Sequence, residues 1–177
     1  MPNWCENTLT VEGAEDAVQR FKQLAKPKEG MTDTDLSLDS LYPVPDEIKN
    51  TVSGGNVIDG VYVKVWREVN GKPVAIPKDE LNAMQKKYGA TNWYTWCTEH
   101  WGTKWDVQAT LTNETPDFLA YGFETAWSPP VAWLTKVARD FPRLRFTLHY
   151  YEPGMGFAGT AIADQGKLIV DTYKEYA

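Results

Sequence analysis

The sequence predicts an α+β fold in which two helices cover one face of an antiparallel sheet. Apolar and polar residues alternate, as in strands with one buried face, in four segments. These segments are 7–12, 106–112, 118–127 and 145–151. Apolar residues recur at helical spacing in two further segments, 14–25 and 130–141. The order strand, helix, strand, strand, helix, strand is the ferredoxin-like split βαβ layout, which we therefore expect.

The first strand and helix are predicted by clear local signals. Leu9 and Val11 alternate with Thr8 and Thr10, so one face of the strand is expected in the core. The helix after Gly13 has acidic residues in its first turn and ends at Lys26-Pro27. Its expected apolar face comprises Ala14, Ala17, Val18, Phe21, Leu24 and Ala25.

An insertion at 27–90 is expected within a single domain of residues 1–177. Its first part, 27–77, is rich in Asp, Ser, Thr, Gly and Pro, which is typical of an irregular excursion. The excursion closes with a predicted hairpin in which Asn70-Gly71 forms the tight turn. A short helix then runs from Asp79 to its terminator, Gly89.

The second half is predicted to run in the order strand, strand, helix, strand. In the strand at 118–127, Leu119, Tyr121, Phe123 and Trp127 share one face and are expected in the core. Ser128 is the expected N-cap of the next helix, with Pro129 at its first position. Its expected buried stripe is Pro130, Leu134, Val137, Ala138 and Phe141. Strands at 157–163 and 167–173 add a C-terminal hairpin, and the open sheet face should carry Thr8, Thr10, Gln108, Thr110 and Thr112.

Composition limits the classes of function. The chain has 177 residues, 42% of them hydrophobic, and a net charge of −6, with all of the excess negative charge in residues 1–60. That balance weighs against unaided binding to duplex nucleic acid, where cationic side chains neutralise phosphates. No apolar run approaches a membrane span, and the start lacks the features of a secretion signal, so a cytoplasmic location is expected. Cys5 and Cys97 are then expected to be reduced thiols.

The segment richest in tryptophan is NWYTWCTEHWGTKWD at 92–106, which contains four of the eight tryptophans. Its dense indoles predict either a ligand pocket or a structural corner of the core. In the pocket interpretation Trp101 and Trp105 stack on a ring, while Lys104 and Asp106 give polar direction. In the structural interpretation Gly102 allows close backbone approach, the tryptophans cap the core, and Lys104 pairs with Asp106 on the surface.

Four ordered segments carry a family resemblance: MPNWCENTLTVEG at the start, HWGTKWD, ETAWSPP and YYEPGMGFAG. Together they resemble the YubB-like group of phage- and plasmid-encoded proteins with a ferredoxin-like domain. The likeness spans nearly the whole chain, apart from 28–90. It implies an accessory protein of a mobile genetic element, without an assigned biochemical activity, and suggests by analogy interference with host defence.

Other motifs have weaker chemical signals. Cys97 and His100 have half of the spacing of a zinc site, but the chain has only two histidines and two cysteines, so no metal is expected. The EPGMG turn at 152–156 lacks the strand-to-helix context of a dinucleotide loop, so its glycines are assigned to tight backbone geometry. No catalytic signature is present, and neither catalytic residues nor cofactors are expected.

The expected function is therefore binding without turnover, through an aromatic surface. The predicted ligand-binding residues are Trp101, Lys104, Trp105, His100, Glu124, Trp127 and Tyr151. The expected partner is a host protein or a nucleotide-like small molecule, because an aromatic patch serves either as a protein hot spot or as a stacking pocket. The alternatives are a binder of single-stranded nucleic acid and an enzyme acting on a nucleotide or sugar.

Overall fold

The structure, a computed structural model, describes residues 3–27 and 33–176 and divides into two compact units. The first unit is formed by Met1–Pro43 and Trp101–Ala177, and the second by Val44–His100. The insertion expected at 27–90 overlaps the second unit, although it starts and ends earlier. Within the described residues, none of the helices has the length and apolar character required to cross a membrane.

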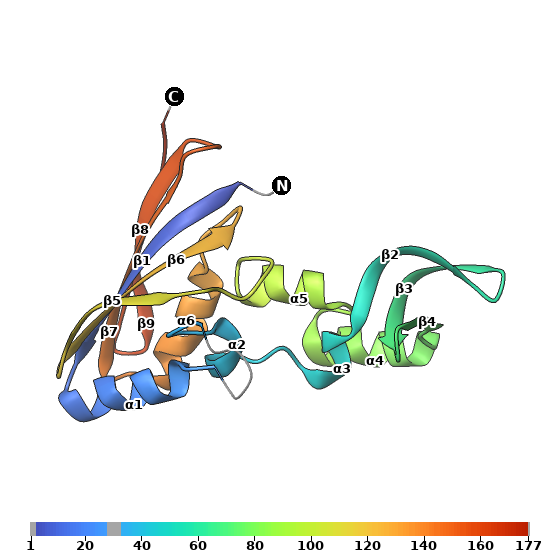
Figure 1. Ribbon diagram of the computed structural model, residues 1–177, viewed down its shortest axis with the longest axis horizontal. Coiled ribbons are helices and arrows are strands. Elements are labelled where there is room, and N and C mark those ends of the chain that lie inside the picture. The colour runs from blue at the N-terminus through green and yellow to red at the C-terminus, as the bar shows by residue number, and fades with distance from the viewer. Residues whose placement is uncertain (1–2, 28–32, 177) are drawn as a thin grey trace. The chain divides into compact units, whose positions relative to one another are not determined.

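The first unit contains a six-stranded antiparallel sheet in the order β5-β6-β1-β7-β8-β9 (Figure 1). Its strands are β1 (Trp4–Gly13), β5 (Thr110–Thr115), β6 (Phe118–Ala126), β7 (Leu144–Glu152), β8 (Phe157–Asp164) and β9 (Lys167–Glu175). Strand β1 lies between β6 and β7, where Leu9 pairs with Tyr121 on one side and Leu148 on the other. This order confirms the predicted ferredoxin-like layout with an extra C-terminal hairpin.

Two helices, α1 (Glu15–Ala25) and α6 (Val131–Asp140), lie against one face of this sheet (Figure 1). The core between these helices and the sheet is apolar at its centre apart from the buried hydroxyl of Tyr121, as the alternation of β1 and β7 predicts. It includes Leu9, Val11, Val18, Phe21, Leu119, Tyr121, Leu134, Val137, Phe146 and Leu148. Two expected members of the α1 stripe differ, because Ala14 is the exposed N-cap residue and Leu24 is exposed near the helix end.

Strand β5 begins four residues later than predicted. The backbone before it is paired with the segment ahead of α2 (Leu38–Leu41) instead of with a strand. Ala109 donates its N–H to Thr34 Oγ1 at 2.8 Å, and its carbonyl accepts the N–H of Asp35 at 2.8 Å. Val107 and Ala109 are nevertheless buried, as their alternation predicts.

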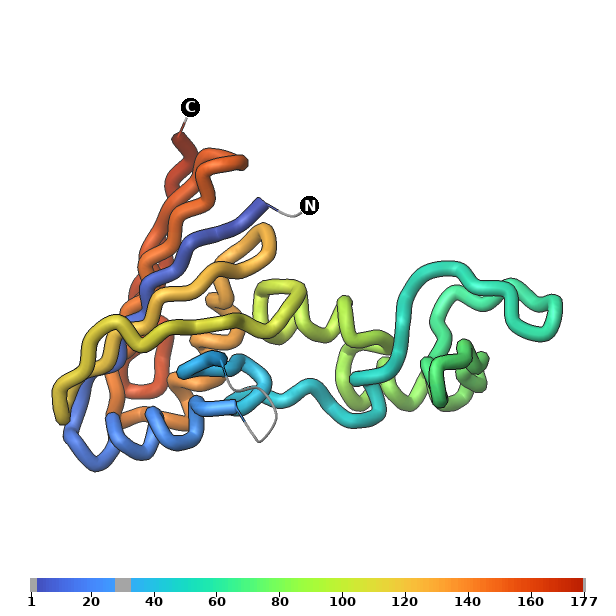
Figure 2. The backbone as a smooth tube through the Cα atoms, viewed as in Figure 1, coloured from blue at the N-terminus to red at the C-terminus, as the bar shows by residue number. Residues whose placement is uncertain are grey.

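The second unit is built around a three-stranded antiparallel sheet, β2-β3-β4 (Figure 1). Figure 2 traces the backbone of this unit from residue 44 to residue 100. Its elements are α3 (Asp46–Lys49), β2 (Thr51–Ile58), β3 (Val61–Val69), β4 (Lys72–Ala75), α4 (Lys78–Tyr88) and α5 (Trp93–His100). The Asn70-Gly71 turn is confirmed, with both residues at positive φ, as is the helix that ends at Gly89.

Part of the expected irregular segment is ordered into regular elements, namely α2, α3 and β2, while residues 28–32 of that segment lie outside the described residues. The sequence does not predict strand β2, because Gly54 and Gly55 interrupt the alternation of apolar and polar residues. Gly55 leaves the space that the Tyr62 ring occupies, and the carbonyl of Gly54 accepts a hydrogen bond from the Trp66 indole at 3.0 Å. These glycines therefore allow the bulged strand β2 to accommodate the rings of Tyr62 and Trp66, which both belong to β3.

Candidate functional site

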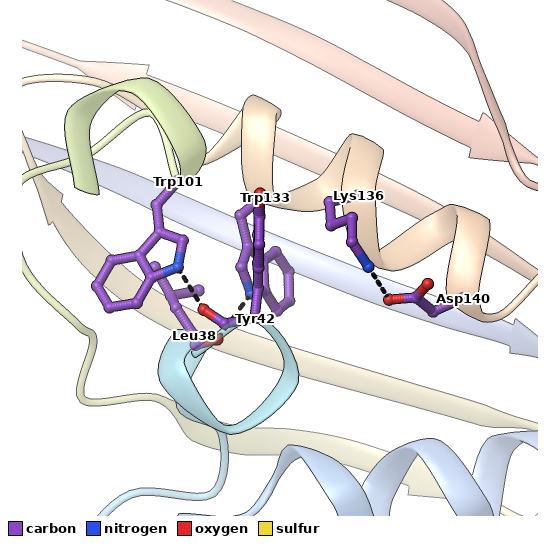
Figure 3. Close-up of polar contacts among 6 residues, drawn as sticks. All are labelled: Leu38, Tyr42, Trp101, Trp133, Lys136 and Asp140. Atoms are coloured by element: carbon purple, nitrogen blue, oxygen red, sulfur yellow. Dashed lines mark hydrogen bonds and ion pairs between the residues drawn. The ribbon is translucent and has the colours of Figure 1, made fainter. Parts of the chain in front are cut away.

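The Trp-rich segment separates into buried and exposed indoles. Trp101 is only 3% exposed, and its indole N–H donates to the carbonyl of Tyr42 at 2.8 Å. Trp133, from α6, makes the matching bond to the carbonyl of Leu38 at 3.1 Å (Figure 3). Both bonds fix the short helix α2 against the core, so Trp101 lies in the core and does not contribute to an aromatic surface.

Asp106 caps the N-terminal end of α2. Its carboxylate accepts hydrogen bonds from the Ser37 hydroxyl at 2.6 Å and from the backbone N–H groups of Leu38 at 2.6 Å and Asp39 at 3.3 Å. It also accepts the N–H of Val107 at 2.8 Å. A carboxylate at a helix N-terminus satisfies donors that have no partner within the helix. Asp106 is therefore a structural cap, which explains why an aspartate closes the HWGTKWD motif.

The ETAWSPP motif folds differently from its predicted helix start. The hydroxyl of Ser128 donates to the carbonyl of Gly102, so it does not cap α6. The N-cap is Pro130, without a side-chain hydrogen bond, and the helix begins at Val131. Gly102 is required here, since it has a φ of +84° and a Cβ would lie 3.1 Å from the carbonyl oxygen of Pro129.

Trp127 is not in the core, contrary to the prediction from strand alternation. Strand β6 ends at Ala126, and Trp127 takes a left-handed conformation with a φ of +66°. Its N–H donates to the carbonyl of Asn3 at 2.9 Å. The left-handed turn directs the indole outward, and it is 41% exposed.

Trp127 joins Trp4 and Trp105 in an exposed row that we call the tryptophan surface. The ring centroids of Trp105 and Trp127 are 6.4 Å apart at 25°, and those of Trp4 and Trp105 are 6.2 Å apart at 35°. Each indole is 40–45% exposed. The Lys104 ammonium lies over this row, 4.4 Å from the Trp105 centroid and 5.4 Å from that of Trp127, a cation–π geometry.

A pocket of about 710 Å³ adjoins the tryptophan surface on the open face of the main sheet. Its lining comprises Trp4, Glu6, Asn7, Thr8, Trp105, Asp106, Gln108, Gly122, Phe123, Glu124, Thr125 and Ala126. Glu6 on β1 pairs in register with Glu124 on β6 and with Tyr151 on β7, so these three residues form one row across the sheet. All three are exposed.

The structure brings together five of the seven predicted ligand-binding residues within or near this region: Lys104, Trp105, Glu124, Trp127 and Tyr151. His100 belongs to the second unit, where its ring stacks on Trp96 with centroids 4.5 Å apart. Trp4 and Glu6 were missed. Extending the period-two pattern of Thr8 and Thr10 towards the N-terminus would have placed both on the open face.

The EPGMG turn is structural, as predicted. The carboxylate of buried Glu152 accepts the N–H groups of Gly154, at 2.9 Å, and Met155. Gly156 has a φ of +73°, and a Cβ there would lie 2.7 Å from the carbonyl oxygen of Tyr176. Within residues 3–27 and 33–176, there is no group of three or more His, Cys, Asp or Glu residues that could hold a metal ion.

Cys5 faces the core on the strand that carries Trp4 and Glu6. Burial raises the pKa of its thiol from 9.0 to about 12; the hydroxyl of Thr125 opposes this shift and the charge of Glu152 adds to it. Cys97 is also buried. A thiol is a poor nucleophile while it keeps its proton, so Cys5 is not suited to nucleophilic chemistry.

Iodoacetamide at about pH 8 should therefore alkylate neither cysteine of the native protein, while both should react after unfolding, because only unfolding exposes them. Mass spectrometry counts the adducts, and one rapid adduct on native protein would contradict the assignment.

The raised pKa of Cys5 also makes the stability of the protein depend on pH. The unfolded chain loses the Cys5 proton first, so the free energy of unfolding should fall as the pH rises from about 9 towards about 12.

Comparisons with known proteins agree with this architecture. Residues 100–177 match the family model described as a ferredoxin-like domain in Api92-like protein. The crystal structure of protein Api92 from Yersinia pseudotuberculosis is similar, with a TM-score of 0.57 and 13% sequence identity, over 100% of this chain and 99% of that chain. A comparison with curated proteins found no match. The structural likeness supports the ferredoxin-like fold and carries no information on activity.

Proposed function

We propose that the protein is a non-catalytic binding protein that recognises its partner through the tryptophan surface and the adjoining pocket. The observation that carries this proposal is the clustering of three indoles, Trp4, Trp105 and Trp127, each 40–45% exposed. Exposed tryptophans contribute large apolar areas that a folded protein otherwise buries, and clusters of them are typical of recognition sites. Binding by occupancy needs no nucleophile, in agreement with the two buried thiols.

The pocket favours a small organic molecule as the partner. Its volume of about 710 Å³ falls within the usual range for ligand sites, roughly 300–1,000 Å³. The neighbouring indoles offer faces on which a planar group can stack. Three acidic residues in the lining, Glu6, Asp106 and Glu124, disfavour phosphate groups and weigh against single-stranded nucleic acid.

The biological setting that we propose is an accessory role for a phage or plasmid within the cytoplasm of the host cell, with host-defence interference as its purpose. Support comes from the four ordered motifs that resemble the YubB-like group. Three of these motifs contain residues with defined structural roles. Asp106 of HWGTKWD caps α2, Ser128 of ETAWSPP donates its hydroxyl to the carbonyl of Gly102, and Glu152 of YYEPGMGFAG accepts backbone N–H groups of its own turn. Sequestering a small signalling molecule is an activity that a stacking pocket could provide.

Native mass spectrometry after incubation with a low-molecular-weight extract of host cells tests the binding function. Wild-type protein should gain the mass of one small molecule above its own 20.1 kDa. The Trp4→Ala/Trp105→Ala double variant should gain none, because the stacking surface is removed. Tyr62→Ala is the matched control, since Tyr62 is an exposed aromatic residue of the second unit. The proposal fails if wild-type protein gains no mass, or if the double variant binds as well.

A further inference from the structure

We infer that the pocket beside the tryptophan surface recognises an organic cation, an alkylammonium or guanidinium group. This inference rests on the proposed function and specifies the charge of the ligand that the same site takes. Three observations carry it: two opposed carboxylates, an acidic lining without basic side chains, and aromatic rings at the rim.

The first observation is the direct pairing of Glu6 with Glu124 across β1 and β6. Like charges directly opposite each other on neighbouring strands destabilise a sheet, with Cβ atoms only about 5 Å apart. Among the described residues, neither carboxylate takes part in a hydrogen bond or ion pair. The sheet therefore maintains an unfavourable pair at its open face, and a cation placed between the two carboxylates would relieve the repulsion.

The second observation is the composition of the lining, which contains three acidic residues and no lysine, arginine or histidine. The carboxylate of Asp106 is engaged in capping α2, which leaves Glu6 and Glu124 to face a ligand. A concave surface lined by charges of one sign concentrates counter-ions of the other sign. This electrostatic field favours a cationic ligand over an anionic one.

The third observation is the aromatic rim formed by Trp4 and Trp105. The face of an indole attracts ammonium and guanidinium groups. Lys104 already occupies such a position, with its ammonium 4.4 Å from the Trp105 centroid and 5.4 Å from that of Trp127, so a ligand cation would use the ring of Trp4 or the face of Trp105 that Lys104 does not cover. A bare metal ion would need several oxygen ligands at close range, and the described residues form no such group. Carboxylates combined with indoles suit an organic cation better.

The test uses indole N–H signals in two-dimensional NMR spectra of the whole protein, titrated with three probes. The probes are agmatine, the peptide acetyl-Gly-Arg-Gly-amide, and the same peptide with neutral citrulline in place of arginine. We expect agmatine or the arginine peptide to shift the signals of Trp4 and Trp105, and the citrulline peptide to bind at least about tenfold more weakly. Binding of agmatine assigns a small molecule as the source of the cation, whereas binding of the arginine peptide alone assigns a polypeptide.

Variants separate this inference from the proposed function. Glu6→Gln/Glu124→Gln should weaken cation binding about tenfold, since two exposed charge contacts are lost. Glu12→Gln is the matched control, because Glu12 lies on the same face of β1 beyond the pocket, and it should leave binding unchanged. Equal binding of the arginine and citrulline peptides, or unchanged binding by the double variant, would refute the inference that the site prefers a cation. The proposal that the tryptophan surface is a binding site would still stand. If no probe shifts the signals, the cation inference fails, and the extract experiment alone decides the binding function.

Discussion

Replacing Trp101 by alanine should lower the free energy of unfolding by about 3–5 kcal/mol, the usual cost of truncating a buried tryptophan. The side chain is 3% exposed, so its removal leaves a cavity. It also leaves the carbonyl of Tyr42 without the indole donor that binds it at 2.8 Å. Because that bond fixes the end of α2, we expect the loss to spread to the packing of Leu38.

The matched control is Trp105→Ala, four residues along the chain. Trp105 is 40% exposed, so its truncation should change the free energy of unfolding by less than about 1 kcal/mol. Urea denaturation followed by far-ultraviolet circular dichroism measures both values. Equal losses for the two variants would mean that the Trp-rich segment is uniformly structural, and would remove the distinction between core indoles and the tryptophan surface.

Replacing Gly159 by alanine should lower the free energy of unfolding by about 3 kcal/mol, near the upper end of the cost of overpacking. A Cβ at this position would lie 2.1 Å from the carbonyl oxygen of Thr172 and 2.2 Å from the hydroxyl of Tyr150. That hydroxyl donates to the same carbonyl at 2.8 Å, so the methyl group would disrupt a bond as well as separate β8 from β9. The strands must move apart, because a backbone oxygen cannot rotate away.

Gly122→Ala provides the control in the same sheet. Its Cβ would meet only the Thr112 methyl group, at 3.6 Å, an ordinary contact. This substitution should be neutral or stabilise by up to about 1 kcal/mol, since alanine has less conformational freedom to lose on folding. Thermal unfolding measures the difference between the variants. A Gly159→Ala protein as stable as Gly122→Ala would show that the β8–β9 edge tolerates the displacement.

The periodic elements of the fold could be predicted from the sequence, because each is encoded by its own local pattern. Strand β7 alternates perfectly, and the apolar stripe of α6 from Leu134 to Ala138 is buried, as is the C-cap residue Phe141. The prediction failed where a distant segment competes for the backbone. Strand β5 starts late because Thr34 binds Ala109, a contact between residues 75 positions apart. No window of local sequence contains that information.

The candidate site was predictable only in part. The exposed state of Trp105 and the buried state of Trp101 both follow from tertiary contacts, and the two residues look alike in the sequence. Trp127 continues the apolar face of β6 in the sequence pattern, yet its left-handed φ ends the strand and reverses the expected orientation. A non-glycine residue in that conformation cannot be recognised from alternation alone.

The left-handed conformation of Trp127 sets the stability of the protein against its binding surface. A bulky residue at a φ of +66° is conformationally unfavourable, by roughly 1–2 kcal/mol, and glycine would adopt the same backbone without that strain. Glycine would also remove the indole that stacks beside Trp105. At this one position, thermodynamic stability and partner recognition therefore favour opposite residues, so a search for more stable variants would select against the binding surface.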